Sequence, residues 1–299
     1  MSVREGKILA LAGGIDFADK PQKELDGLFT KTLNDGMHGL CFSAYEEGQK
    51  PGTVLTEDQI RRRMKIIQPY TKWVRSFSCI EGNELIPKIA KEFGIKTLVG
   101  AWLGKETEKN EQEIAALIQL AKEGYVDIAA VGNEVLYRED LTEDELLDFI
   151  FRVKAAIPEI PVGYVDAYYE FSVRPKITEA CDVILANCYP FWECCLMDYS
   201  LMYMKQMYSQ ALNAGGGHKR VIITETGWPS KGENYKGAQP SRENAIKYFI
   251  NTQLWSKEEN IDIFYFSSFD ESWKVGAEGD VGAYWGIWDK NENIKYGLE

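Results

Sequence analysis

Eight short apolar runs recur along this 299-residue chain, and segments with helical periodicity separate them. None of the runs alternates regularly between apolar and polar residues, which is typical of strands buried on both faces of a parallel sheet. The runs span residues 39–43, 73–77, 97–101, 127–131, 161–165, 183–187, 221–224 and 263–267. Eight alternating strand and helix units predict a single α/β domain with the (β/α)8 TIM-barrel fold.

The segments between the runs carry helix signals. Thr56 and Gln59 have the spacing of a capping box, and so have Thr142 and Glu145, and apolar residues at helical spacing follow both pairs. We therefore expect one helix after Thr56 and another after Thr142. Further helices are predicted at 111–122, 196–214 and 241–256.

The two ends of the chain do not fit the repeating pattern. One helix is predicted near 20–34, so we expect residues 1–37 to be an N-terminal extension that packs on the barrel and residues 38–299 to be the (β/α)8 catalytic domain. No long helix is predicted after the last strand. Residues 283–296 instead indicate a hairpin with its turn at 289–292.

Composition excludes some functions. The net charge of −12 argues against nucleic-acid binding, which needs a basic surface, and is compatible with a neutral substrate. No run of about 18 uncharged apolar residues is present, so we expect no membrane span, and the first residues lack the apolar run of a signal peptide. The protein is therefore expected to be either cytoplasmic or cut after a secretion signal, and to be a monomer.

The residues that bind soft metals are few, with two histidines and six cysteines in the whole chain. Cys194 and Cys195 have no spacing that is typical of a zinc site. The other cysteines lie in or beside apolar runs and are expected to be small buried residues: Cys41, Cys79, Cys181 and Cys188. We expect no metal, no cofactor and no disulfide framework.

Two glutamates follow predicted strands at the end where a (β/α)8 barrel carries its chemistry. Glu134 comes after the fourth strand, and Glu225 comes after the seventh. Two carboxyl groups at one barrel mouth suit glycoside hydrolysis, because one must donate a proton to the leaving oxygen while the other stays ionised beside the anomeric carbon. The alternative is that these are two of 46 acidic residues that end strands by chance or form salt bridges. Their matched positions favour the first interpretation.

Other polar residues at strand ends fit the same mouth. Arg75 follows the second strand and Tyr189 follows the sixth, and we expect both to contact Glu225 and keep it ionised through hydrogen bonds. Asn133 is expected to bind the sugar 2-hydroxyl beside the reacting carbon. A buried arginine with a purely structural role is the alternative for Arg75.

Aromatic residues gather after the predicted strands, and the apolar faces of sugar rings stack on aromatic side chains. Trp102, Trp192 and Trp228, each just past a strand end, are the strongest candidates for such a platform. Tyr45 and Phe191 are further candidates for contact with a sugar. Core packing is the competing interpretation for each of them.

Four motifs resemble those of the family 17 glycoside hydrolases, which are β-1,3-glucan-active enzymes with catalytic glutamates after strands four and seven. They are V-G-N-E at 131–134, N-C-Y-P-F at 187–191, T-E-T-G-W-P-S at 224–230 and F-D-E-S-W-K at 269–274. The resemblance runs from Gly39 to Leu298. The segments G-L-C-F-S-A-Y and E-G-Q-K-P-G look closer to bacterial and fungal branches than to plant ones, and we expect a bacterial-like branch.

The resemblance implies roles for individual residues. It implies Glu134 as the acid/base and Glu225 as the nucleophile of a reaction that retains the anomeric configuration. It also implies that Asn133 and Tyr189 support these two glutamates.

The segment after the eighth strand matches the family less completely. Glu271 and Lys274 correspond to the acidic and basic positions that line the glycone side in the family. The chain departs at Asp270, because the plant enzymes have Asn-Glu where this sequence has Asp-Glu. This departure puts the contacts of the segment in question.

The leading hypothesis is a retaining β-1,3-glucanase that cleaves neutral, laminarin-type glucan. A transglycosylase is the close alternative, since the same glutamates serve both reactions and a sugar hydroxyl replaces water in the second step. A non-catalytic glucan-binding barrel and a barrel acting on β-1,4 or β-1,6 linkages are weaker alternatives. Endo or exo action, chain-length preference and compartment stay open.

Overall fold

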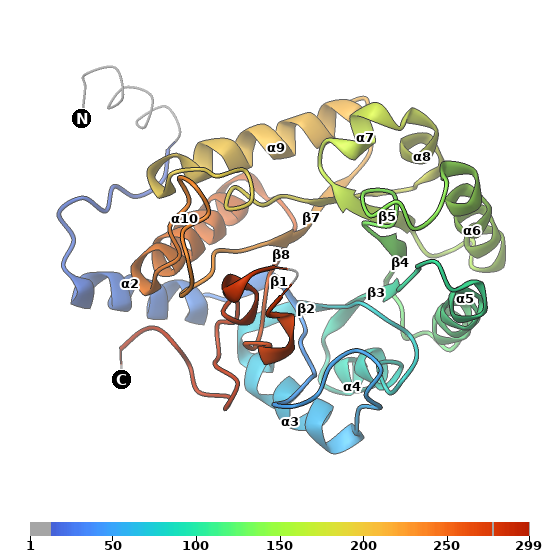
Figure 1. Cartoon of the computed structure of the whole chain (residues 1–299), viewed down its shortest axis with the longest axis horizontal. Helices are drawn as coiled ribbons and strands as arrows, with labels where there is room; N and C mark the ends of the chain where they lie inside the picture. Colours follow the sequence, from blue (N-terminus) through green and yellow to red (C-terminus); the bar gives the residue numbers. More distant parts are fainter. Residues whose placement is uncertain (1–12, 277, 299) are drawn as a thin grey trace.

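The computed structural model describes residues 13–276 and 278–298 of the chain. Within them, eight parallel strands close into a barrel in chain order (Figure 1). The strands are β1 (Met37–Cys41), β2 (Thr71–Ser76), β3 (Lys96–Ala101), β4 (Ile128–Asn133), β5 (Val162–Ala167), β6 (Ile184–Asn187), β7 (Val221–Thr226) and β8 (Ile263–Tyr265). Each predicted run overlaps one strand, so the predicted (β/α)8 barrel is confirmed.

Helices surround the barrel (Figure 1). The α-helices are α2 (Gln22–Asn34), α3 (Glu57–Ile67), α4 (Leu85–Glu92), α5 (Thr107–Lys122), α6 (Glu143–Ala156), α7 (Glu170–Val173), α8 (Pro175–Ala180), α9 (Ser200–Ala214) and α10 (Arg242–Glu259). Short 3-10 helices are η1 (Gln68–Tyr70), η2 (Met197–Tyr199), η3 (Ser272–Lys274) and η4 (Asp280–Ala283). Among the described residues, no helix has the length and apolar character needed to cross a membrane.

The predicted helix starts agree with the structure to within two residues, except at α5, which begins at Thr107 rather than at residue 111, and at α9. Capping boxes are present at Thr56 and Thr142, where each threonine side chain accepts a hydrogen bond from the main-chain N–H three residues later. The helix that we expected from residue 196 begins at Ser200, because Met197–Tyr199 forms the 3-10 helix η2.

The predicted N-terminal helix is α2, which lies beside α10 on the outside of the barrel (Figure 1). Phe29 of α2 packs on Phe249 of α10 with ring centroids 4.9 Å apart, and on Tyr296 near the C-terminus at 5.2 Å. Since no long helix follows β8 in the described residues, α2 covers this gap in the helical layer. The packing supports our proposal that the segment before β1 is fixed on the barrel; residues 1–12 of it lie outside the described residues.

The hairpin predicted at 283–296 is wrong in part. Its turn is present and is closed by main-chain hydrogen bonds of Asp289, but antiparallel pairing is limited to a single bridge at Trp288. The reason is that the loop after β8 already engages Trp288, whose N–H donates to the carbonyl of Ser268 and whose carbonyl accepts from the N–H of Asp270, both at 2.9 Å. The C-terminal segment is therefore attached to the barrel rather than paired with itself.

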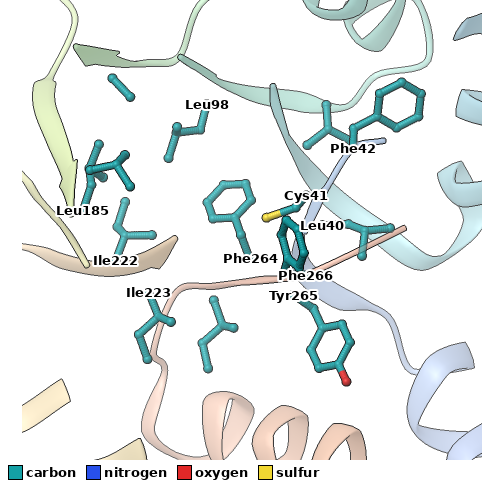
Figure 2. Close-up of a cluster of buried hydrophobic side chains, with 14 of the residues drawn as sticks. Leu40, Cys41, Phe42, Leu98, Leu185, Ile222, Ile223, Phe264, Tyr265 and Phe266 are labelled. Carbon is teal, nitrogen blue, oxygen red and sulfur yellow. The ribbon is translucent and has the colours of Figure 1, made fainter. Parts of the chain in front are cut away.

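The barrel interior is filled by apolar side chains, with the ring of Phe264 at the centre of the cluster in Figure 2. Gly39 of β1 makes room for this ring, because a Cβ atom there would lie 2.5 Å from a carbon of Phe264. The four cysteines that we expected to be buried are buried: Cys41, Cys79, Cys181 and Cys188. This apolar filling leaves the carboxyl ends of the strands as the polar mouth of the barrel.

Candidate active site

A cavity of about 1230 Å³ lies at the carboxyl ends of the strands and contains both glutamates, Glu134 and Glu225. Other predicted site residues also line it: Asn133, Tyr189, Glu271, Lys274, Tyr45, Trp102 and Trp192. Arg75 is only 1% exposed and contacts Glu225 from within the barrel. The strand ends singled out in the sequence therefore converge on one cavity.

Glu225 is buried and held at both carboxylate oxygens. Nη1 of Arg75 donates to Oε1 at 2.6 Å, and the hydroxyl of Tyr189 donates to Oε2 at 2.8 Å. Nη2 of the same arginine donates to Oδ1 of Asn133 at 2.6 Å. Both contacts that we expected for Glu225 are present, and Arg75 also fixes the residue that precedes Glu134.

Glu134 lies on a tight turn that follows β4. Its φ of 52° is in the left-handed region, and its main-chain N–H donates to the carbonyl of Val165 in β5 at 2.7 Å. The guanidinium group of Arg138 donates to the carbonyls of Asn133 and Leu103 and so closes the turn. The backbone therefore holds the Glu134 carboxyl group at the cavity.

Asn187, the last residue of β6, connects the two glutamates. Its Nδ2 donates to Oε1 of Glu134 at 2.9 Å and to Oε1 of Glu225 at 3.1 Å. Because the same nitrogen donates to both oxygens, the distance between Oε1 of Glu134 and Oε1 of Glu225 is at most the sum of the two hydrogen-bond lengths, about 6 Å. Asn187 is absent from the predicted site residues, although it opens the N-C-Y-P-F motif. Its strand-end position, equivalent to that of Asn133, is the signal that could have found it.

The surroundings distinguish the two carboxyl groups. Burial raises the pKa of Glu134, and the negative charge of Glu225 raises it further, whereas the hydrogen bond from Asn187 lowers it. Glu225 forms an ion pair with the buried guanidinium of Arg75. A raised pKa suits a proton donor, and a paired carboxylate suits a nucleophile.

The β8 side of the cavity carries a largely buried charge cluster. Lys274 pairs with Glu271 at 3.1 Å and lies 4.1 Å from the ring centroid of Phe266. Glu278 also lines the cavity; burial raises its pKa and Lys274 lowers it. Glu278 belongs to none of the four motifs and is not among the predicted site residues. Across the described ranges, no group of three or more His, Cys, Asp or Glu side chains is arranged to hold a metal ion.

Asp270, the departure from the plant pattern, has a partner that accounts for it. Its Oδ1 accepts from Nζ of Lys295 at 2.8 Å and from the N–H of Gly286 at 2.9 Å. The acidic residue thus helps to attach the C-terminal segment to the barrel. Glu271 and Lys274 still line the cavity, so the departure does not remove them from the site.

The expectation that Trp228 and Phe191 contact a sugar is wrong, because they are 1% and 0% exposed. Their rings pack on each other at 5.2 Å, and Trp228 packs on Tyr248 of α10 at 5.5 Å. Gly227 lets the chain pass so close to β8 that a Cβ atom there would lie 2.0 Å from the carbonyl oxygen of Phe266. The indole that follows is placed between the barrel and α10.

Three predicted aromatic residues do line the cavity, namely Tyr45, Trp102 and Trp192. Trp102 is 38% exposed, and the guanidinium group of Arg138 lies 4.6 Å from its ring centroid. Further tyrosines that we did not predict as binding residues line the cavity as well: Tyr137, Tyr168, Tyr169 and Tyr235. Aromatic surfaces of this kind fit stacking against sugar rings.

Two more carboxyl groups are buried near the glutamates, and no pattern in the sequence marks them. Glu113 of α5 accepts from the hydroxyl of Ser78 at 2.5 Å and from the N–H of Cys79 at 2.7 Å. Asp166 of β5 accepts from the hydroxyl of Tyr164. Burial raises the pKa of Glu113 and that of Asp166 to about 7.

We predict that the protein loses stability as the pH rises from 5 to 8. The folded state holds the Glu113 proton up to a pKa of about 7, whereas the unfolded chain releases it near 4.5, so this stabilisation is complete below 4.5 and is lost as the pH rises through 7. Between pH 5 and 8 the loss from Glu113 alone is about 2.5 kcal/mol. Urea unfolding at a series of pH values measures it.

Two variants on the same helix separate this effect from general surface charge. Glu113→Gln is expected to reduce the pH dependence of the unfolding free energy, and Asp166, whose pKa burial also raises to about 7, keeps the rest. Glu111→Gln changes a carboxyl that is 46% exposed and paired with Arg152, and is expected to leave the slope unchanged. An unaltered slope in Glu113→Gln contradicts the prediction.

Fold and site together define a class of protein. A (β/α)8 barrel with glutamates at the ends of β4 and β7 in a cavity lined by aromatic rings is built like a glycoside hydrolase. Residues 39–286 match the BtgE/BtgC glycoside hydrolase domain. The chain belongs to this family, which comprises glucan 1,3-β-glucosidases and β-1,3-glucanosyltransferases of the family 17 type.

Known relatives agree with this assignment. The chain is 26% identical over 272 residues to a glucan 1,3-β-glucosidase of Saccharomyces cerevisiae, which covers 83% of this chain and 87% of the relative. It is similar to the crystal structure of a family 17 β-1,3-glucanosyltransferase from Rhizomucor miehei, with a TM-score of 0.78, 30% identity and coverage of 89% of this chain and 98% of that one. An active-site mutant of that transferase is known in complex with laminaritriose. The predicted family is confirmed, and the chain is a glycoside hydrolase that hydrolyses β-1,3-glucan or transfers glucanosyl groups.

Proposed function

We propose that this enzyme cleaves β-1,3-glucosidic bonds of neutral, laminarin-type glucan with retention of configuration, using Glu225 as nucleophile and Glu134 as acid/base. The shared donor Asn187 carries the proposal, because it brings oxygens of the two carboxyl groups to within about 6 Å. Retaining enzymes have separations of about 5–5.5 Å, and inverting enzymes have about 6.5–9.5 Å to leave room for a water molecule. This upper limit lies below the inverting range and supports direct attack by a carboxylate.

In the first step, an oxygen of Glu225 attacks the anomeric carbon while Glu134 gives its proton to the glycosidic oxygen. The bond to the leaving sugar breaks, and a glycosyl ester forms on Glu225. Arg75 balances the charge of Glu225 before the attack. The raised pKa of Glu134 favours the protonated form that this step requires.

In the second step, Glu134 takes a proton from an incoming hydroxyl group, whose oxygen attacks the anomeric carbon and releases Glu225. Water as the acceptor gives hydrolysis, and a sugar hydroxyl gives transfer. Trp102 favours transfer as the second candidate function, since Arg138 both covers its ring and holds the Glu134 turn. An exposed indole beside the acid/base fits a sugar acceptor.

Product analysis tests this proposal. Laminari-oligosaccharides are incubated in H₂¹⁸O, and the products are followed by mass spectrometry and by NMR of the anomeric proton. We predict that the β-anomer appears first. Labelled products shorter than the substrate assign hydrolysis, and products longer than the substrate assign transfer. An α-anomer as first product contradicts retention, and binding without turnover supports the non-catalytic alternative.

A further inference from the structure

We propose that Asn187 is a positioning residue for the two glutamates: its amide group determines which oxygen of Glu134 carries the proton, and it donates a hydrogen bond to whichever glutamate is ionised at each step. This inference rests on the proposed roles of Glu134 and Glu225. Asn187 is 3% exposed and touches one oxygen of each reacting group.

A hydrogen bond to the oxygen of the Asn187 amide fixes the orientation of the group. Its Oδ1 accepts from the hydroxyl of Thr224 in β7 at 2.9 Å, and Thr224 is fully buried. An amide nitrogen has two N–H donors. One of them is directed to Glu134 and the other to Glu225, so both donors are engaged.

This arrangement restricts the proton of Glu134 to one oxygen. A neutral carboxylic acid carries its hydrogen on one of its two oxygens. Nδ2 of Asn187 lies 2.9 Å from Oε1 of Glu134 and directs an N–H at it. A hydrogen on Oε1 would therefore point at another hydrogen. The proton therefore lies on Oε2, which gives it to the glycosidic oxygen in the first step and takes a proton from the acceptor in the second.

The same contacts distinguish the two oxygens of Glu225. Oε1 accepts from Arg75 and Asn187, whereas Oε2 accepts from Tyr189. Because Oε2 accepts fewer hydrogen bonds than Oε1, Oε2 is the attacking atom. Oε1 becomes the carbonyl oxygen of the ester. Esterification removes the charge of Glu225 just as Glu134 becomes a carboxylate. The hydrogen bond from Asn187 to Glu134 then becomes the charge-assisted one.

A pH readout follows from this position. Asn187 stabilises the carboxylate form of Glu134, so its loss raises the pKa of that group and moves the alkaline limb of kcat/KM to higher pH. Other charged or titratable groups also face Glu134 from several elements and are left in place: Glu225, Arg138, Arg75, Asp166, Tyr189 and Glu278.

The experiment compares pH profiles of Asn187→Ala with the parent enzyme on laminari-oligosaccharides and on an activated aryl β-glycoside of laminaribiose. We expect kcat/KM on the oligosaccharides to fall by about 10- to 100-fold. We also expect the alkaline limb to rise by about half a pH unit or more. The loss should be smaller on the activated substrate, whose leaving group needs no proton.

Two further variants make the test independent of folding. Asn187→Asp keeps the shape of the side chain and adds a carboxyl group beside Glu134, so its alkaline limb is expected to rise further. Asn110→Ala is the matched control: Asn110 is also a buried asparagine, with hydrogen bonds of 2.8 and 2.7 Å to Gly104, and its loss is expected to lower Tm without moving the limb.

The outcomes separate this inference from the proposed function. One outcome overturns only the role of Asn187: the alkaline limb of kcat/KM stays at the parent pH in both Asn187 variants, although Glu134→Ala and Glu225→Ala lose activity as proposed. Full activity in Glu225→Ala overturns the proposed function itself. A limb that moves equally in Asn110→Ala also overturns the inference, because the shift then reflects a general loss of packing.

Discussion

Glu225→Ala is expected to abolish retaining turnover of every β-1,3-glucoside, by about 10⁴-fold or more, because no glycosyl ester can form without this carboxylate. Glu134→Ala removes only the group that transfers protons. A substrate with a good leaving group needs no protonation, so Glu134→Ala should still form the ester from it. The two variants therefore differ in which substrates they spare.

The assay is turnover of an activated aryl β-glycoside of laminaribiose with and without azide. Azide needs no general base, so it should restore turnover to Glu134→Ala and yield a β-glycosyl azide. Any azide product from Glu225→Ala should be inverted. Glu193→Ala, which removes a carboxyl group that lines the cavity and bonds Tyr168 at 3.1 Å, serves as a control with a loss below about 10-fold. If Glu225→Ala keeps retaining activity and Glu134→Ala loses it even with azide, the assignment is reversed.

The barrel was predictable because burial on both faces gives parallel strands a signal that needs no tertiary information. The strand ends were less predictable. The apolar run of β4 stops at Val131, but the strand continues to Asn133, and β7 continues from Thr224 to Thr226. The strands extend into the polar mouth of the barrel. There the main-chain hydrogen bonds between strands continue beyond the end of both apolar runs.

The two glutamates could be predicted because, in this fold, a polar residue at the carboxyl end of a buried strand lies at the mouth of the barrel. No comparable rule predicts whether an aromatic side chain at a strand end points into the cavity or into the core. Trp228 follows a strand end as Trp102 does, yet only Trp102 reaches the cavity, because Gly227 brings the chain close to Phe266. That close approach depends on β8, which is distant in the sequence.

Buried polar contacts across the barrel were the hardest part to predict. Asn187 bridges groups on β4 and β7, and Glu113 reaches from α5 to the loop after β2. Each contact joins residues that are far apart in the chain. Sequence spacing shows which element carries a polar residue, but the partner is determined only when the barrel closes.

Arg75→Met is expected to lower the free energy of unfolding by about 3–5 kcal/mol, because removal of one partner leaves a buried charge uncompensated. Arg75 donates to Glu225 and to Asn133, both at 2.6 Å, and its guanidinium group lies 4.2 Å from the ring centroid of Phe77. Methionine fills a similar volume without a charge. Activity is expected to fall as well, since the nucleophile loses a partner that orients it.

Arg75→Lys separates charge from geometry. A lysine keeps the positive charge, but one ammonium group does not reproduce the planar fork that bridges Glu225 and Asn133. We expect most of the stability to return while kcat/KM stays about 10- to 100-fold below that of the parent. Urea unfolding and steady-state kinetics on laminari-oligosaccharides measure the two effects.

Arg63→Met is the matched control, because Arg63 is the other large, fully buried arginine among the described residues. It pairs with Glu292 at 3.1 Å and donates to the main-chain carbonyls of Ser43 and Tyr45, but it contacts neither Glu134 nor Glu225. A similar loss of stability with a loss in kcat below about 10-fold is expected. Equal losses of kcat in Arg63→Met and Arg75→Met would show that Arg75 acts only through folding, whereas a selective loss in Arg75→Met ties its contact with Glu225 to the reaction.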